Sequence, residues 1–529
     1  MRHQPDNPSQ RTLRRWRPRA LAAGILATAA LTLPAGAARA FPSDEAVREI
    51  LRQRVEVSKR GVGYVVGLVD ETGGRIISYG SASRGGGRPV DGDTVFQVGS
   101  VTKVFTSLLL AEMSGRGEVR LDDPIALHVP ASVKTPRARD ITLLHLSRHT
   151  AGFMSFPGDS DAADLDSPMA VHSNEMLFAV LDKHPMRSTA GDHHSYSSYG
   201  AALLGELLAR RAGTDYESAV RSRLLEPLGM TRSGFALTAE LRAAHATGHT
   251  SRGNPRRLAE VGGMLGSGAL RSTANDLVRF VQAHLGLRAT TLGEALRATQ
   301  RTEADRQRPD LPMGLGWFYA DYPGTRVVYH GGSTPGFRAY VGMDLQRKRG
   351  VIVLANSDND VGNLGMHLVD PYVPLYSPEP PRQFKAIVVE PRLLREYAGA
   401  YRIDEPPGVL TFRRRGDGLL ATSPHGTWRV FAESDTSFFT EDMENWGTFT
   451  RDSKGRVDGF TWRRENWQQH LKRAPDRNSP AHQRRAHHRR HHRAQARNAG
   501  LTRCSGRSGI CALLNVNSGR LGGDPARML

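Results

Sequence analysis

The sequence predicts an α+β protein in which an antiparallel sheet is flanked by helices, next to an all-helical lobe, and is followed by a small all-β barrel. Strand patterns come first, a largely helical stretch follows, and strand patterns return near residue 326. Strands from both ends of the domain would then close one sheet. After about residue 393, short alternating stretches separated by turns such as Gly416-Asp417-Gly418 indicate the barrel.

The elements of the main domain can be placed in order from their periodicity. Helical spacing covers 44–59, and two strands at 63–69 and 75–79 follow, joined by a turn. A helix runs from Ser100 with apolar residues on one side, and Gly115 ends it. The returning strands lie at 326–330, 339–343 and 350–356.

Composition divides the chain into five predicted parts. A Pro-rich stretch is typical of a linker, and the last residues are rich in Arg, His, Ser and Gly without periodicity, which indicates disorder. The parts are a signal peptide (1–40), the main domain (41–371), the linker (372–391), the barrel (392–473) and a disordered basic tail (474–529).

The N-terminus has the pattern of a secretory signal peptide. Arginines precede an apolar run from Ala20 to Ala38, and Ala38-Arg39-Ala40 fits a cleavage site. An uncleaved anchor is the rival interpretation, but the run is Ala-rich and broken by Pro34. We therefore expect a secreted or periplasmic protein without a stable membrane span after cleavage, exported by either the general or the twin-arginine route.

The formal net charge of +19 is concentrated in the termini. Residues 1–40 have a net charge of +6 and residues 474–529 of +9, which leaves +4 on the remainder. Nucleic-acid binding needs positive charge on the folded surface, so we expect no nucleic-acid partner. Both cysteines, Cys504 and Cys511, lie in the tail, which excludes thiol catalysis and Cys-ligated metals in the body. No cofactor motif is present, and we expect neither cofactor nor metal.

The most informative motif is Ser100-Val101-Thr102-Lys103. On a helix, residues three apart share a face, so Lys103 would lie beside the Ser100 hydroxyl. A serine needs a base to become a nucleophile, and a desolvated lysine can lose its proton near neutral pH. Such a spacing also arises by chance at a plain helix start, so it needs support from elsewhere in the chain.

Support comes from an ordered set of motifs. Phe96–Phe105, Leu121–Pro124, Ile141–Phe153 and Gly268–Leu277 together resemble the serine β-lactamase and D-alanyl-D-alanine carboxypeptidase superfamily, in its class C-like branch. The resemblance covers roughly residues 44–360 and implies a β-lactamase/transpeptidase-like fold. The C-terminal module is similar to the lipocalin-like β-barrel appended to many members.

The resemblance assigns further site residues. The family's Tyr-x-Asn box falls on Tyr196-Ser197-Ser198, which implies that Tyr196 shares proton transfer with Lys103; which of the two is the base stays open. A phenol near two positive groups would ionise more readily. Ser198 replaces the family's Asn and would be a shorter substrate contact with a single donor.

The third box falls on His330-Gly331-Gly332. By resemblance, His330 would supply a positive or hydrogen-bonding group beside Tyr196, and the two glycines would let the strand approach the substrate. The backbone N–H groups of Ser100 and Ser333 would form the oxyanion hole. Gly331 lacks the hydroxyl that many members use to hold a carboxylate, which leaves room for other specificities.

These residues together predict an exported serine hydrolase that works through an acyl-enzyme. D-amino-acid peptides, as in a D-Ala-D-Ala carboxypeptidase, are the first expected substrates, with peptidoglycan as a possible partner. A carboxylesterase and a class C-like β-lactamase are alternatives. A non-catalytic peptide-binding or penicillin-binding protein is the alternative of another class. The oligomeric state is not predicted.

Overall fold

The computed structural model describes residues 40–475 with gaps. The gaps are residues 134, 156–172, 182, 184–185, 187, 259–261, 302–311, 323–324, 377, 379, 381, 404–407, 424–425, 441–444 and 465–466. The predicted signal peptide up to residue 39 and the predicted tail from residue 476 lie outside the described residues.

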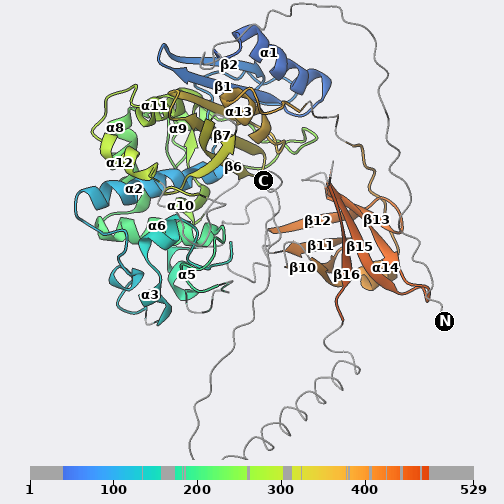
Figure 1. Ribbon diagram of the computed structural model, residues 1–529. Coiled ribbons are helices and arrows are strands. Elements are labelled where there is room, and N and C mark those ends of the chain that lie inside the picture. The colour runs from blue at the N-terminus through green and yellow to red at the C-terminus, as the bar shows by residue number, and fades with distance from the viewer. Residues whose placement is uncertain are drawn as a thin grey trace, which may run out of the picture. The chain divides into compact units, whose positions relative to one another are not determined.

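A six-stranded antiparallel sheet organises the main domain, in the order β2-β1-β8-β7-β6-β5 (Figure 1). Tyr64 of β1 lies opposite Ala355 of β8, so strands from both ends of the domain close the sheet, as predicted. The strands are β1 (Gly63–Asp70), β2 (Gly73–Gly80), β5 (Phe318–Tyr322), β6 (Thr325–Thr334), β7 (Phe337–Asp344) and β8 (Arg349–Ala355).

Alternate residues of β1 enter two different hydrophobic cores, because successive side chains of a strand point to opposite faces. Val65 packs in the core that includes Leu277 of helix α11 (Ala274–His284). Tyr64 packs in the core that includes Val47 of helix α1 (Asp44–Arg52) and Leu364 of helix α13 (Gly362–Val369). Both faces of the sheet are therefore covered, which explains why β8 is buried along its whole length.

The helices cover the two faces of the sheet and form the separate helical lobe (Figure 1). The α-helices are α1 (Asp44–Arg52), α2 (Thr102–Gly115), α3 (Arg137–Asp140), α4 (Leu143–Ser147), α5 (Asn174–Ala179), α6 (Ser198–Arg211), α7 (Tyr216–Val220), α8 (Glu226–Leu228), α9 (Ala239–Ala244), α10 (Leu265–Gly268), α11 (Ala274–His284), α12 (Gly293–Thr299) and α13 (Gly362–Val369). Two π-helical turns, η1 (Gln53–Val57) and η4 (Arg221–Leu225), and two 3₁₀ turns, η2 (Gly99–Val101) and η3 (Ile125–Leu127), adjoin them.

Helix α2 is buried on almost every side from Thr102 to Ala111. A helix that is buried all round belongs to the interior of a domain rather than to its surface. Its start is fixed by the short pairing of β3 (Phe96–Gln97) with β4 (Arg271–Ser272). The residues at the beginning of α2 are thus held in the centre of the domain.

The C-terminal module is a closed eight-stranded barrel in the order β10-β11-β12-β13-β14-β15-β16-β9. Helix α14 (Pro391–Tyr397) precedes it, and aromatic rings fill its interior, with the rings of Tyr397 and Phe449 stacked 4.1 Å apart. The strands are β9 (Gly399–Ile403), β10 (Gly408–Arg415), β11 (Gly418–Ser423), β12 (Gly426–Ala432), β13 (Ser437–Thr440), β14 (Asn445–Arg451), β15 (Val457–Arg464) and β16 (Trp467–Arg473).

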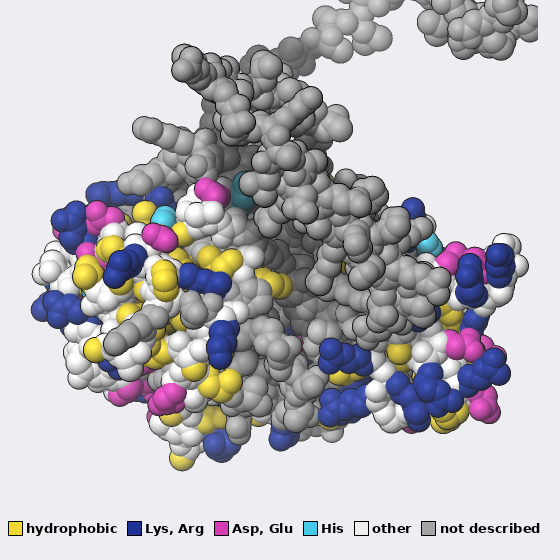
Figure 2. All heavy atoms as spheres, turned by 90° about the horizontal axis from the view of Figure 1, so that it is seen from below, with side chains coloured by type: hydrophobic (Ala, Val, Ile, Leu, Met, Phe, Trp, Pro, Cys, Tyr) yellow, Lys and Arg dark blue, Asp and Glu magenta, His cyan; other side chains and the backbone are white. Residues whose placement is uncertain are grey.

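On the face seen in Figure 2, the coloured Lys and Arg side chains are interspersed with acidic and apolar ones. None of the helices in the described ranges combines the length and the apolar character that a bilayer crossing requires.

Candidate active site

Ser100 and Lys103 lie together at the start of α2. Ser100 is in the 3₁₀ turn η2 that leads into the helix, and Lys103 follows one turn later. The Lys103 Nζ atom is 2.9 Å from the Ser100 Oγ atom. The structure therefore brings the hydroxyl and the amine within hydrogen-bonding distance, as their spacing in the sequence predicts.

Lys103 is buried, with 2% of its surface exposed. Its Nζ atom also donates a hydrogen bond to the carbonyl oxygen of Ser267, at 2.6 Å. Burial lowers the pKa of Lys103 to about 7, because the ammonium form loses its hydration. Near neutral pH, a large share of Lys103 is therefore a free amine that can accept the Ser100 proton.

Tyr196 lies beside the Ser100–Lys103 pair and just before helix α6 in the chain. The turn into that helix is fixed by Ser197, whose Oγ accepts a hydrogen bond from the Gly200 N–H at 2.9 Å. The Lys103 Nζ atom lies 4.9 Å from the centroid of the Tyr196 ring, and the Ser100 side chain is near enough to the Tyr196 hydroxyl to affect its pKa. A hydroxyl, an amine and a phenol thus share one site.

The expectation that Tyr196 ionises more readily is wrong. Burial raises the pKa of Tyr196, and the nearby Ser100 side chain opposes this only in part. The two groups expected to be positive are themselves buried and have lowered pKa values. Tyr196 is therefore a neutral phenol, able to pass a proton along but not present as a standing phenolate.

His330 is also neutral, so of its two expected roles, a positive or a hydrogen-bonding group, the structure favours the hydrogen-bonding one. Its Nδ1–H donates to the carbonyl oxygen of Gly331 at 2.6 Å, and its buried Nε2 atom has no partner. Burial and the nearby Lys103 lower the pKa of His330 to about 3. The ring lies 6.4 Å from that of Tyr196, so His330 offers a lone pair to the site.

The C-terminal half of β6 forms an open edge beside the nucleophile. Strand β5 pairs with β6 only from Thr325 to Tyr329, and residues 330–334 pair only with β7 among the described strands. This edge touches the η2 turn closely: a Cβ on Gly332 would lie 1.9 Å from the Val98 carbonyl oxygen. Only glycine permits that approach.

Gly99 allows the same approach from the other side. Its φ of +52° lies in the left-handed region, and a Cβ there would lie 2.6 Å from the Ser333 backbone nitrogen. The N–H groups of Ser100 and Ser333 are thereby brought to the same part of the site, as an oxyanion hole requires. A Cβ on Gly331 would instead meet only the Ala339 carbonyl oxygen, at 4.0 Å, so the space beside Gly331 is open.

Ser198 is placed differently from the other site residues. It is the buried first residue of α6. The hydrogen bonds of Lys103 within the described structure go to Ser100 and Ser267 and not to Ser198. The structure shows no direct link between Ser198 and the Ser100–Lys103 pair.

Three groups at the site were not assigned from the sequence. The ring of His149 lies 4.5 Å from that of Tyr196, and its Nδ1 accepts a hydrogen bond from the Ser197 N–H at 3.2 Å. The ring of Phe318 stacks on that of Tyr196, with the ring centroids 6.3 Å apart. Ser267 acts through its backbone carbonyl, which leaves no signal in the sequence, whereas His149 lies in a motif already singled out.

Within the described ranges, no three or more His, Cys, Asp or Glu side chains gather in a way that could hold a metal ion.

Comparison with protein families identifies the main domain. A family model described as Beta-lactamase matches residues 47–367. The chain belongs to the beta-lactamase family. A second model, described as a domain of unknown function (DUF3471), matches residues 385–475, which include the barrel.

This chain is similar to relatives that are named as beta-lactamases and to one that is named as a D-alanyl-D-alanine-carboxypeptidase/endopeptidase. A beta-lactamase of Lysobacter lactamgenus is 27% identical over 326 residues, which cover 56% of this chain and 82% of the relative. The D-alanyl-D-alanine-carboxypeptidase/endopeptidase AmpH of Escherichia coli (strain K12) is 25% identical over 297 residues, which cover 52% of this chain and 74% of the relative.

Solved structures agree with this assignment. The D-alanine carboxypeptidase AmpC from Burkholderia cenocepacia has a TM-score of 0.51 and 26% identity, and the match covers 60% of this chain and 96% of that structure. A class C beta-lactamase has a TM-score of 0.53 at 24% identity, with 59% and 91% covered, which supports the fold. The chain is a serine hydrolase of the beta-lactamase family.

Proposed function

We propose that this beta-lactamase family member is an exported hydrolase that cleaves D-amino-acid peptides, as a D-Ala-D-Ala carboxypeptidase does, through an acyl-enzyme on Ser100. The observation that carries the proposal is the 2.9 Å distance between Ser100 Oγ and Lys103 Nζ, together with the lowered pKa of Lys103, about 7. A nucleophile and a neutral base are therefore in contact before any substrate binds.

In the first half of the reaction, Ser100 Oγ attacks the substrate carbonyl carbon while its proton passes to Lys103 or Tyr196. The carbonyl oxygen gains the negative charge, and the N–H groups of Ser100 and Ser333 stabilise it. The bond to the leaving group then breaks, and the leaving nitrogen takes a proton from Tyr196 or Lys103. The product is an ester of Ser100 and a free amine.

In the second half, a water molecule attacks the ester carbonyl carbon. The same basic group accepts the water proton, the same N–H groups hold the oxyanion, and Ser100 leaves with a proton. The acid product departs and the site returns to its starting state. Neutral His330 can accept a hydrogen bond through its unpartnered Nε2 during these transfers.

The open edge of β6 supports a peptide substrate. An extended peptide can pair with an unpaired strand edge through main-chain hydrogen bonds, and residues 330–334 present such an edge next to Ser100. Relatives named as D-alanine carboxypeptidases favour a D-amino-acid peptide as that substrate. The predicted signal peptide supports export to the place where wall peptides are found.

A carboxylesterase is the second candidate, and Gly331 is the residue that favours it. The position has open space and no hydroxyl, so it cannot hold a substrate carboxylate through a side chain. An uncharged ester would not need that contact. One comparison of substrates tests the peptidase and the carboxylesterase together with two further candidates, a beta-lactam substrate and a non-catalytic binding role.

The experiment compares a D-Ala-D-Ala peptide, p-nitrophenyl esters and a chromogenic cephalosporin on the wild-type protein and on Ser100→Ala. We expect turnover of the peptide, and a fluorophosphonate adduct on Ser100 seen by mass spectrometry. Ser114→Ala, near the other end of α2, is the matched control and should behave as the wild type. Labelling without turnover of any substrate would favour the binding protein, and no labelling at all would overturn the hydrolase.

Export is tested separately. The N-terminal sequence of the protein recovered from its producing cells should begin at Phe41, in the extracytoplasmic fraction. Protein that retains residues 1–40 or stays in the cytoplasm would contradict the proposed localisation.

A further inference from the structure

The turn between β6 and β7, which follows Ser333 directly, is held by one buried carboxylate. Asp358 lies in the loop after β8, and its side chain is 4% exposed. Its Oδ1 atom accepts a hydrogen bond from the Gly336 N–H at 2.9 Å and another from Arg338 Nη1 at 2.9 Å. Its Oδ2 atom accepts from Arg256 Nε at 2.8 Å.

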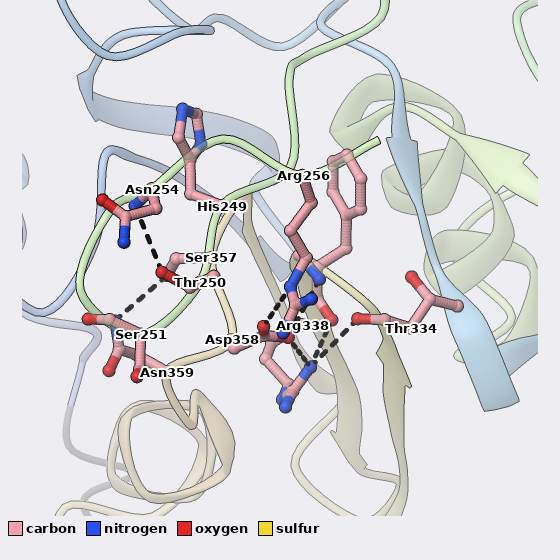
Figure 3. A network of polar contacts seen from close by, with 12 residues as sticks. His249, Thr250, Ser251, Asn254, Arg256, Thr334, Arg338, Ser357, Asp358 and Asn359 are labelled. Carbon is pink, nitrogen blue, oxygen red and sulfur yellow. Dashed lines mark hydrogen bonds and ion pairs between the residues drawn. The ribbon is translucent and has the colours of Figure 1, made fainter. Parts of the chain in front are cut away.

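Arg338 connects this carboxylate to both sides of the turn. Besides the bond to Asp358, its Nη1 atom is within hydrogen-bonding distance of the carbonyl oxygens of Thr334, at 3.1 Å, and Phe337, at 2.9 Å, so its two N–H groups are shared among three acceptors. Figure 3 shows the two guanidinium groups converging on Asp358, with Arg338 also reaching Thr334. The planar guanidinium fixes the direction of the Nη1 donors toward these acceptors, whereas the donors of a lysine ammonium rotate freely.

Asp358 and Arg338 together form a clamp on the β6–β7 turn, and this clamp lies next to Ser333, the proposed oxyanion donor. Arg338 of β7 is the ladder partner of Ser333 of β6, and Thr334 is the next residue along the chain. The Ser333 backbone in turn lies against Gly99, whose added Cβ would reach the Ser333 nitrogen. A shift of the turn therefore moves the Ser333 N–H relative to Ser100.

We propose that Asp358 is a positioning residue for the oxyanion hole, because it fixes the β6–β7 turn and with it the Ser333 N–H. The inference rests on the proposed acyl-enzyme function. An oxyanion donor stabilises the transition state only when it is pre-aligned with the developing charge. Asp358 touches neither substrate nor Ser100, and its effect reaches the reaction through Gly336 and Arg338.

The test compares an ester with its thiono analogue, in which sulfur replaces the carbonyl oxygen. Hydrogen bonds from an aligned oxyanion hole favour the oxygen ester. A displaced hole therefore lowers the oxygen-to-sulfur rate ratio, which is the acylation rate of the ester divided by that of its thiono analogue. For Asp358→Asn, we expect kcat/KM for the p-nitrophenyl ester to fall by about 10- to 100-fold, somewhat less than the loss of a whole oxyanion donor. The thiono ester should lose much less.

Asp344→Asn is the matched control, since Asp344 is a buried carboxylate at the other end of β7. Its side chain is 2% exposed and is paired with Arg347 at 2.8 Å. We expect it to lower the melting temperature without changing the oxygen-to-sulfur rate ratio. Equal ratios in Asp358→Asn, Asp344→Asn and the wild type would overturn the positioning role.

Arg338→Lys keeps the inference testable if Asp358→Asn does not fold. A lysine keeps the charge beside Asp358 but lacks the planar group that directs Nη1 toward the Thr334 and Phe337 carbonyls, so we expect an oxygen-to-sulfur rate ratio between those of the wild type and Asp358→Asn. A wild-type ratio in a folded Arg338→Lys protein would also count against the clamp. If the wild-type protein forms no acyl-enzyme with either ester, the proposed function fails and the inference fails with it.

Discussion

The Lys103 amine donates to the backbone carbonyl oxygen of Ser267 at 2.6 Å. A carbonyl oxygen can only accept, so this bond occupies one N–H and leaves the lone pair of the neutral amine free for the Ser100 hydroxyl, 2.9 Å away. The orientation of the Lys103 amine is thus set by a backbone atom on α10, and its protonation is set by burial.

The pH dependence of acylation should report Lys103. Burial lowers its pKa to about 7, so the ammonium form dominates below this value and the amine above it. We expect the acylation rate to rise with pH through a midpoint near 7 and to level off within about one unit above it. Stopped-flow measurements with a p-nitrophenyl ester would give the profile.

The control for this profile is His330→Gln. Because the pKa of His330 is about 3, its replacement should leave the midpoint near 7 even if the rate changes. A midpoint close to the ordinary lysine value in the wild type, or a midpoint that disappears with His330, would contradict the assignment.

The close approach of β6 to the nucleophile turn should make Gly332 intolerant of a side chain. A Cβ there would lie 1.9 Å from the Val98 carbonyl oxygen, so Gly332→Ala has to push the strand edge away from Ser100. We expect kcat/KM to fall by about 100-fold or more, comparable to the loss of an oxyanion donor. Gly331→Ala, one residue away with open space, should change it far less; similar losses in both would refute the steric argument.

A hydroxyl at position 331 should shift the specificity. Gly331→Thr fits the open space beside β6 and adds a donor for a substrate carboxylate. A hydrogen bond to a charged group contributes about 1.5–3 kcal/mol, so we expect kcat/KM for a D-Ala-D-Ala peptide to rise about 10-fold relative to a neutral ester. Gly331→Val has the same shape without the hydroxyl, and an equal gain in that variant would show that shape alone is responsible.

His149 should support Tyr196 during proton transfer. It has a φ of +56°, and its Nδ1 accepts from the Ser197 N–H, next to Tyr196. His149→Phe loses the acceptor and strains the backbone, so the segment that carries Tyr196 shifts, and we expect kcat to fall by about 10-fold, with KM little changed. His149→Asn tolerates the left-handed backbone and carries an acceptor oxygen, and it should recover part of kcat.

The control for this effect is His145→Ala. His145 accepts from the Thr142 N–H at the start of α4, so its loss should lower the melting temperature rather than kcat. A fall of kcat in His145→Ala as large as in His149→Phe would indicate a general loss of packing.

Elements with strong periodicity were predictable from the sequence. The spacing of apolar residues located α2, and the return of strand patterns after the helical stretch located β6, β7 and β8 and predicted that both ends of the domain share one sheet. Strand β5 was not predicted, because it is a short edge strand without a clean alternation: its five residues include Asp321 and only one buried position.

The site was predictable where its chemistry lies in side chains at fixed spacing. Ser100 and Lys103 are one helical turn apart, and the ordered motifs supplied Tyr196 and His330. The protonation states were not predictable, because the neutrality of His330 and Tyr196 follows from burial. The roles of Ser267 and Asp358 also could not be seen, since the first acts through its backbone and the second through a turn far away in the sequence.

The pairing of β1 with β8, in which Tyr64 faces Ala355, has a consequence for biosynthesis. The seam at which these two strands meet lies inside the sheet, between the first strands to be made and the last. The ribosome must therefore synthesise almost the whole domain before β1 can pair with β8. A nascent chain that stops short of β8 leaves one side of β1 without its partner strand. Native topology of this kind delays folding until synthesis is nearly finished.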